Sequence, residues 1–311
     1  MPDPQIDQPA TLEGSLLERW NALPGNVRGG IIFILAAVFF SVMVALIKIV
    51  GQRLHITEIL LFRQLTMVLI AAPVLWAGWP ESLHSARPKL QVVRVGLAFM
   101  AMTLGFSAIV ALPLAEATVI SFSKTFFTTV FAIFILGEVV RTPRWIAVVV
   151  GFVGILIIVW PALSSDYGIW HIAALASAVC VSLVFIIIRI LSQVDQPVTI
   201  LTYQAVGVGI LMIAPAIWFW QTPTLAEFGL LVLIGVVSVV AQYLNILAMK
   251  AGEASALAPL EYTRLIFAAA LGYFLFAEWP EPRVWVGAAL IIAAALYVLY
   301  RERKVGSPSN M

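Results

Sequence analysis

Lys124 places a permanent positive charge inside a long apolar stretch, TVISFSKTFFTTVFAIFILGE, which runs from Thr118 to Glu138. Arg264 stands in a comparable position, because each of these two cations precedes a glutamate, Glu138 or Glu278, by 14 residues. A cation in such a place can bind an anionic or carbonyl group of a ligand, or it can form an internal ion pair. The choice between the two depends on the nearby acidic residues and on the surroundings of the stretch.

Glu261 lies three residues before Arg264, so the two side chains can neutralise each other on one helical face. For Arg264, a binding role and a structural ion pair therefore both stay open. No acidic residue lies within a helical turn of Lys124, which is predicted to face a polar cavity and a bound substrate. Arg63 stands about a turn and a half into its own apolar segment, and it is predicted to extend outward to the membrane surface.

The composition indicates that these charges lie in a membrane. Of the 311 residues, 62% are hydrophobic and only 11% are charged, whereas a typical soluble domain has about 25% charged residues. Apolar segments of about 20 residues, long enough to cross a bilayer as a helix, recur along the chain. Ten are predicted, over residues 29–50, 57–78, 91–110, 114–136, 145–161, 169–191, 198–220, 227–248, 254–277 and 284–300. They are too long for barrel strands, so the expected fold class is an all-α membrane protein embedded in a lipid bilayer.

Lysine and arginine are distributed unevenly between the links that join these segments. With the N-terminus inside, twelve of the 18 basic residues fall on the cytoplasmic side and three on the opposite side, while three lie within segments. This bias predicts that both termini, 1–28 and 301–311, are cytoplasmic. The net charge of +2 gives no reason to expect a nucleic-acid partner.

The chain contains a repeat of about 140 residues. The link ALPLAEAT (111–118) is similar to AMKAGEAS (248–255), and GEVVRTPRW (137–145) is similar to AEWPEPRVW (277–285). The chain therefore divides into two repeats of five segments, 29–161 and 169–300. Because five is odd, the second repeat enters the membrane inverted relative to the first, as in alternating-access transporters. A three-residue insertion falls near Pro259, and a proline inside a segment predicts an interrupted helix there.

Ten segments in two inverted repeats, joined by short links and with a GE pair closing the fourth, resemble the drug/metabolite transporter superfamily with paired EamA domains. The stretches ATVISFS (117–123), FRQ (62–64) and APLEY (258–262) are similar to the branch that includes S-adenosylmethionine and riboflavin uptake carriers. The resemblance implies a multi-pass protein of a bacterial-type inner membrane. It also implies a central cavity lined by the first, third, fourth, sixth, eighth and ninth segments, with the fifth and tenth packed behind.

Polar and aromatic side chains gather in the segments that the resemblance places around this cavity. With Lys124, Glu261 and Arg264, the predicted substrate-binding residues are Ser121, Phe122, Tyr262, Gln242, Tyr243, Asn245 and Phe106. Such a set suits a flat heteroaromatic or zwitterionic metabolite, because aromatic rings can stack while Lys124 binds a negative or carbonyl end. Glu261 is the deep acidic candidate for proton coupling.

The expected function is uptake of a small organic molecule of the riboflavin or S-adenosylmethionine type, and export of amino acids or drugs is the alternative. An intramembrane enzyme is not favoured, because the chain lacks H-E-x-x-H, G-x-S-x-G and Walker A motifs and an intramembrane aspartate pair. A channel is a further alternative to a carrier, and it would show unit conductance rather than saturable flux. No cofactor and no metal site is expected, since His55, His84 and His171 fall in separate segments. A homodimer is left open.

Overall fold

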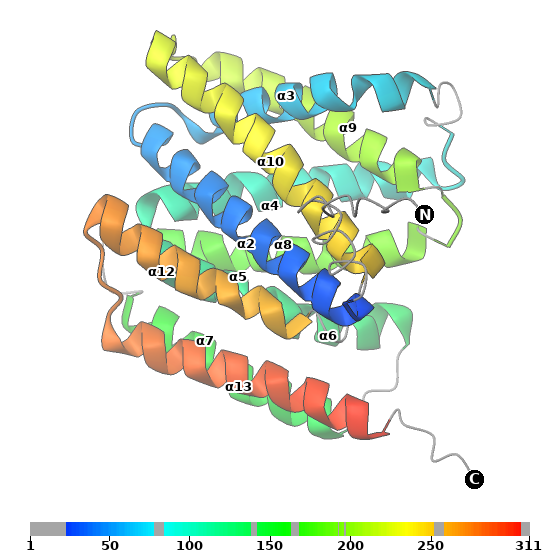
Figure 1. Cartoon of the computed structure of the whole chain (residues 1–311), viewed down its shortest axis with the longest axis vertical. Coiled ribbons are helices and arrows are strands. Elements are labelled where there is room, and N and C mark those ends of the chain that lie inside the picture. Colours follow the sequence, from blue (N-terminus) through cyan, green and yellow to red (C-terminus); the bar gives the residue numbers. More distant parts are fainter. Residues whose placement is uncertain are drawn as a thin grey trace, which may run out of the picture.

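The computed structural model describes residues 23–77, 84–137, 142–162, 168–191, 193–195, 197–251 and 258–305. All regular structure in these residues is helical, and a helical element occupies each of the ten predicted segments (Figure 1), so the all-helical fold class is confirmed. The elements are α2 (Gly25–Val50), α3 (Ile56–Ala77), α4 (Pro88–Ala111), α5 (Leu114–Ser121), α6 (Lys124–Leu136), α7 (Thr142–Ala162), α8 (Gly168–Leu191), α9 (Pro197–Trp218), α10 (Leu225–Ala251), the 3₁₀ helix η2 (Ala258–Tyr262), α12 (Thr263–Phe276) and α13 (Pro282–Val305).

Several of these helices can cross a membrane. Within the described residues, five stretches are long and apolar enough to cross a membrane. They are Val27–Val50, Pro88–Ala111, Leu114–Ile135, Gly168–Leu191 and Leu225–Ala248. Three shorter apolar helices cover Val148–Trp160, Thr202–Trp218 and Pro282–Ala294. Helices suit this setting because they satisfy their backbone hydrogen bonds internally, where no water is present to do so.

The fourth predicted segment, 114–136, is not the uninterrupted helix that was expected. α5 ends at Ser121 and α6 begins at Lys124, and the turn between them is tightened. The N–H groups of Phe122 and Ser123 donate to carbonyls three residues back, at 3.1 and 3.0 Å, which is the 3₁₀ pattern. Neither proline nor glycine marks this turn, so the apolar pattern gave no signal of it. The interruption expected near Pro259 is present, because η2 runs directly into α12.

The fourth segment, in the first repeat, and the ninth segment, in the second repeat, end in the same way. α6 ends at Gly137 with φ of 69°, and α12 ends at Ala277 with φ of 53°, both in the left-handed region. These residues stand immediately before Glu138 and Glu278, the glutamates that mark the repeat. Glycine adopts this conformation without strain, whereas alanine does not. The repeat therefore extends from the sequence to the backbone geometry.

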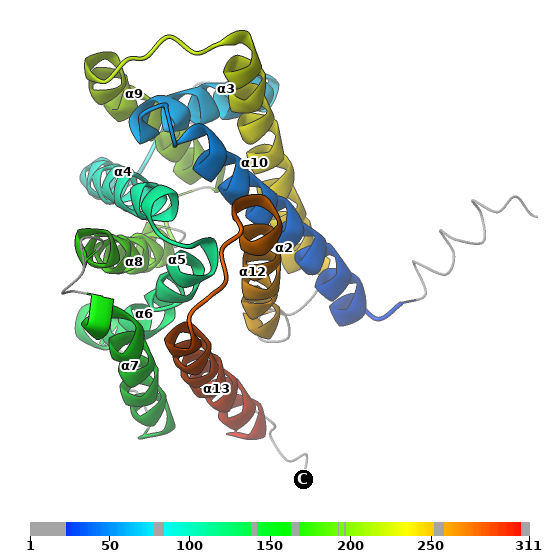
Figure 2. The same ribbon diagram turned by 90° about the vertical axis from the view of Figure 1, so that its left-hand side faces the viewer.

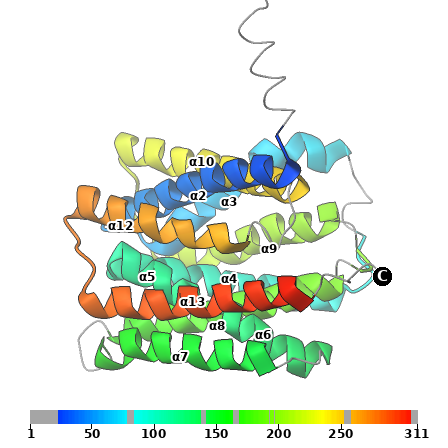
Figure 3. The ribbon, with the colours of Figure 1, turned by 60° about the horizontal axis from the view of Figure 1, so that its bottom comes forward.

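The helices pack in groups that mix the two repeats. α2 lies against α10 and α12, and α4 lies against α8 and α9 (Figure 2). α7 and α13 pack so closely that a Cβ atom added at Gly287 would lie 2.7 Å from the carbonyl oxygen of Gly154. The start of α2 and the end of α13 lie at the same end of the bundle (Figure 3), which we call the terminal end. The short links after α2, α4, α9 and α12 lie at the other end, the distal end.

Candidate functional site

Three charged side chains meet where the two interrupted segments come together. The Glu261 Oε1 atom accepts a hydrogen bond from Lys124 Nζ and lies 3.6 Å from Arg264 Nη1. The exposed fraction is 18% for each of the two cationic side chains and 31% for the carboxylate. Lys124 is the first residue of α6 and Arg264 is the second residue of α12, so both directly follow the interruptions. The cluster is thus largely enclosed by helices and still accessible.

The sequence did not lead to a prediction of the ion pair between Lys124 and Glu261, although the spacing of the repeat contained a signal for it. The two residues are 137 apart, which is also the spacing that aligns Phe106 with Tyr243, whereas Lys124 and Arg264 are 140 apart. The three-residue insertion near Pro259 accounts for the difference between the two spacings. Lys124 therefore has two counterparts in the second repeat, one acidic and one basic, and the structure brings both to it. The expected contact between Glu261 and Arg264 is also present.

The electrostatics of this cluster favour a ligand with an acceptor group. Two cations share one carboxylate, which leaves one net positive charge. The guanidinium carbon of Arg264 lies 3.8 Å from the centre of the Phe40 ring, a cation–π contact. Its Nε atom is buried and has no hydrogen-bond partner among the residues that the structure describes. Because an unpaired buried donor is unfavourable, a carboxylate or carbonyl oxygen of a bound molecule would be well placed there.

Four helices position this cluster. Phe40 belongs to α2, and Ser182 of α8 donates its hydroxyl hydrogen to the Lys124 carbonyl oxygen at 2.8 Å. With α6 and α12, these helices fall in the first, sixth, fourth and ninth predicted segments, all of which the resemblance placed around the cavity. Ser177, on a different face of α8, anchors that helix to α4 by donating to the Ala101 carbonyl oxygen at 2.7 Å.

The predicted residues on the two interrupted turns have structural contacts of their own. Phe122 is 1% exposed and its ring meets the Tyr262 ring edge-on, with centroids 5.0 Å apart. The Ser121 hydroxyl donates to the Thr118 carbonyl oxygen at 2.7 Å. Phe122 and Ser121 therefore support the turn, while Tyr262 is half-buried beside Glu261.

The predicted residues of α10 lie on two different faces. Asn245 stands seven and eleven residues after the buried Ser238 and Ile234, so it continues the inward face, yet it is exposed. Gln242 is also exposed on that side, with Nε2 3.8 Å from Met67 Sδ of α3. The inward face of α10 is therefore exposed at Gln242 and Asn245, whereas Ala248, one turn further on, is buried.

Tyr243 points the other way. It is 60% exposed and lies seven and eleven residues after Val236 and Val232, which are 39% and 38% exposed. Phe106, its counterpart in the first repeat, packs inward on the main core. The structure therefore does not bring Tyr243 to the cluster of charges.

The prediction that Arg63 extends to the membrane surface was wrong. The side chain is 5% exposed, and its Nε atom donates to the Ser238 hydroxyl oxygen of α10 at 2.9 Å. The Phe106 ring of α4 lies 5.9 Å from the guanidinium carbon. Position along a segment shows how far a side chain could reach, but the packing of α3 against α10 and α4 decides its direction.

Ion pairs between the two repeats hold the distal end together. Lys48 Nζ donates to Glu278 Oε1 and to the Leu112 carbonyl oxygen, both at 2.5 Å, and Glu278 Oε2 accepts from the Leu114 N–H at 2.9 Å. Glu116 of α5 lies 3.0 Å from His171 Nε2 of α8. At its distal end the described bundle is therefore closed across the repeats.

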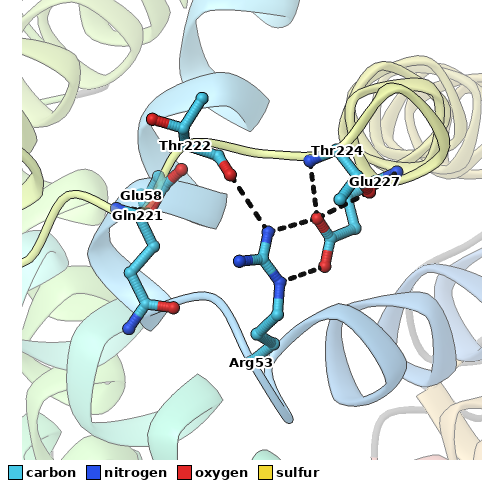
Figure 4. Close-up of polar contacts among 6 residues, drawn as sticks. All are labelled: Arg53, Glu58, Gln221, Thr222, Thr224 and Glu227. Atoms are coloured by element: carbon cyan, nitrogen blue, oxygen red, sulfur yellow. Dashed lines mark hydrogen bonds and ion pairs between the residues drawn. The ribbon is translucent and has the colours of Figure 1, made fainter.

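Arg53 joins the α2–α3 turn to α10 at the same end (Figure 4). Its guanidinium forms a two-pronged ion pair with the Glu227 carboxylate and also donates to the Thr222 carbonyl oxygen at 3.2 Å. The hydrogen bond to Glu227 raises the pKa of Arg53 above its usual value. Beside this pair, Glu58 Oε2 accepts from the Gln221 N–H at 3.2 Å.

Asp195 makes a corresponding connection at the start of α4. Its carboxylate accepts from the Ser85 hydroxyl at 2.5 Å, the Ala86 N–H at 2.8 Å and the Gln91 amide at 2.9 Å. Burial raises the pKa of Asp195, but these hydrogen bonds outweigh it, so the pKa lies below its usual value. Gln91 in turn accepts from Arg94 Nε at 3.2 Å. Among the described residues, no group of three His, Cys, Asp or Glu side chains could hold a metal ion.

Two stretches of the chain, residues 27–160 and 168–300, each match the EamA-like transporter family. The chain belongs to this family. These two EamA regions cover the two repeats found in the sequence, and they make the chain a multi-pass protein of the bacterial inner membrane in a family of small-molecule transporters.

Curated relatives of this EamA-family chain include carriers of both directions. An S-adenosylmethionine uptake transporter of Rickettsia bellii is 31% identical over 275 residues, 88% of this chain and 94% of that protein. A pseudopaline exporter of Pseudomonas aeruginosa is 32% identical over 281 residues, 89% and 97% of the two chains. A riboflavin transporter of Brucella anthropi is 27% identical over 262 residues, which are 81% of this chain and 91% of that protein. A solved crystal structure shares the fold, with a TM-score of 0.62 at 20% identity over 90% of this chain and 99% of the other.

Proposed function

We propose that this EamA-family chain crosses the membrane ten times, with both termini cytoplasmic, and carries a small organic metabolite by alternating access. The twelve-to-three distribution of basic residues supports this orientation. The common location of the start of α2 and the end of α13 supports an even number of crossings. In this arrangement the distal end faces away from the cytoplasm, and the exposed Gln242 and Asn245 lie in the half of α10 nearer to the cytoplasm.

The Lys124–Glu261–Arg264 cluster is the proposed substrate site, and its position carries the proposal. The three charges lie at equivalent helix interruptions of two inverted repeats, which is where transporters of this architecture bind their substrates. A cation in the membrane costs roughly 2.5–3.5 kcal/mol on insertion scales and is usually retained for function. The unpaired Nε of Arg264 gives this site a donor that a substrate can satisfy.

The proposed cargo is a flat heteroaromatic or zwitterionic compound of the S-adenosylmethionine or riboflavin type. A carboxylate or carbonyl group would meet Lys124 and Arg264, and a cationic group would meet Glu261. The rings of Tyr262 and Phe40 provide aromatic surface beside these charges. The uptake relatives support import as the direction.

Export is the second candidate. The pseudopaline exporter is as similar to this chain as the S-adenosylmethionine carrier is, at 32% and 31% identity. If the chain is an exporter, the same site would load its cargo from the cytoplasm.

Reconstitution into liposomes tests the function and its direction. Radiolabelled S-adenosylmethionine, riboflavin and a panel of amino acids would be offered to proteoliposomes of known orientation. We expect saturable flux of at least one of the first two compounds and exchange with the same unlabelled compound inside. Flux of amino acids alone would contradict the proposed cargo, and non-saturable flux with unit conductance would indicate a channel.

A further inference from the structure

Arg63 is a buried cation outside the Lys124–Glu261–Arg264 cluster. It lies on α3 with 5% of its surface exposed. Its Nε atom donates to Ser238 Oγ at 2.9 Å, and its Nη1 atom donates to Gln64 Oε1 at 3.2 Å. Within the part of the chain that the structure describes, no carboxylate lies within ion-pair distance of this guanidinium. All of its close partners are neutral.

Other cations in the interior of the bundle have a carboxylate close by or linked to them through a hydrogen bond. Lys48 pairs with Glu278, and Glu261 serves both Lys124 and Arg264. Arg94, which is 2% exposed, is connected to the Asp195 carboxylate through Gln91. A buried charge without a counter-ion is unfavourable in a membrane interior, and it is a candidate for ligand binding. Arg63 is such a charge.

Two side chains of α4 lie beside Arg63, and neither carries a charge. Met102 Sδ lies 4.0 Å from Nη1, and the Phe106 ring centre lies 5.9 Å from Cζ. The guanidinium is therefore enclosed by α3, α4 and α10 with neutral groups alone among its described contacts.

We infer that Arg63 forms a second subsite, which binds the carboxylate of the transported molecule. One guanidinium with neutral partners matches one negative charge, so a carboxylate fits it better than a doubly charged phosphate. The inference rests on the proposed transport function and narrows its cargo to molecules with a carboxylate.

The second subsite is connected to the first along α2. The Ser238 hydroxyl that accepts from Arg63 lies 2.9 Å from Met43 Sδ, and Phe40, one helical turn away, contacts Arg264. The Arg63 subsite is nearer to the distal end, since Arg63 is seven residues from the start of α3. Its low exposure means that it is covered in this conformation, and the movement of the helices in alternating access opens it.

The first experiment compares S-adenosylmethionine with its decarboxylated analogue as competitors of uptake in wild-type and Arg63→Met proteoliposomes. We expect wild type to prefer the carboxylated compound by at least about tenfold, which is about 1.4 kcal/mol. Arg63→Met should lose this preference while binding the analogue as wild type does. An unchanged preference in the variant would overturn the subsite. If wild type binds neither compound, the proposed cargo fails, and the second experiment decides the subsite alone.

The second experiment needs no knowledge of the cargo. The melting temperature of the detergent-solubilised protein is measured in acetate and in neutral acetamide at constant ionic strength. Cys180, the only cysteine, is buried and reports unfolding by reacting with a thiol dye. We expect acetate to raise the melting temperature of wild type more than that of Arg63→Met or Arg63→Gln. Equal acetate shifts in wild type and both variants would contradict the proposal.

Arg94→Met is the matched control for both experiments. Arg94 is equally buried, but its Nε, Nη1 and Nη2 atoms donate to Gln91, Gln204 and the Ile200 carbonyl. Its loss should lower the melting temperature and leave the acetate shift and the preference for the carboxylated compound unchanged. Arg63→Met should not lower the melting temperature, because it removes an uncompensated charge. A comparable fall in both variants, with equal acetate shifts, would assign Arg63 a structural role.

Discussion

At the scale of single residues, Lys124 and Arg264 share one carboxylate, so removing either cation leaves a neutral pair. We therefore expect Lys124→Met and Arg264→Met to insert and to remain monodisperse. Transport should fall at least about tenfold in each, since about 1.4 kcal/mol of substrate interaction corresponds to that factor. The measurement is initial uptake at equal protein density in proteoliposomes. Normal transport by either variant would remove that residue from the site, and a failure to fold would favour the purely structural ion pair.

Glu261→Gln tests the opposite change, because it leaves Lys124 and Arg264 together without a counter-ion. We expect lower stability than in either methionine variant, since two like charges then share an enclosed space. Glu261 is also the proposed site of proton coupling, so uptake by this variant should not respond to a pH gradient. If the response persists, another carboxylate carries the proton, and the buried Glu116 beside His171 would be examined next.

At the scale of helices, the two left-handed ends give a matched pair of substitutions. Ala277→Gly should raise the free energy of unfolding by about 1 kcal/mol, because it removes the strain of a left-handed alanine. Gly137→Ala should lower it by about 1–2 kcal/mol. Among the described residues, no atom outside the local backbone lies within 4 Å of the added Cβ position, so contact with them does not limit the second substitution. Thiol-dye melting through Cys180 measures both, and changes of the same sign would show that packing rather than backbone strain governs these ends.

Asp195 makes the attachment of α4 to the α8–α9 turn dependent on pH. Its pKa is lowered in the folded protein, so its stabilisation is present above the usual aspartate pKa of about 3.9 and is lost as the pH falls through the folded value. Asp195→Asn should therefore melt at a lower temperature than wild type at pH 7, and the difference should shrink as the pH falls below the usual aspartate pKa. A difference independent of pH would mean that the carboxylate charge is not what stabilises this attachment.

At the scale of the whole molecule, the proposed inverted arrangement of the two repeats predicts which links and termini lie on the same side of the membrane. A reporter fused after residue 311 should lie in the cytoplasm, and one inserted in the 162–168 link should lie on the opposite side. Green fluorescent protein and alkaline phosphatase fusions measure this directly, because each is active on only one side of the inner membrane. Reporters found on the same side would contradict both the topology and the inverted arrangement of the repeats.

The amino-acid sequence by itself determined the helical segments, the repeat and the positions of Lys124 and Arg264 along their segments. These depend on local composition and spacing, since a segment of about 20 apolar residues becomes a helix in lipid whatever surrounds it. The family membership follows from the same features. The i,i+3 contact between Glu261 and Arg264 is local too, and it is present.

Only the tertiary structure decided which way the side chains point and which distant residues meet. Both faces of these helices are apolar, because lipid is as apolar as the protein core, so periodicity could not show that Arg63 is buried and that Tyr243 is exposed. The tightened turn at Phe122 and Ser123 has no proline or glycine to signal it. Lys124 and Glu261 are 137 residues apart, and their contact depends on how the helices of the two repeats pack against each other.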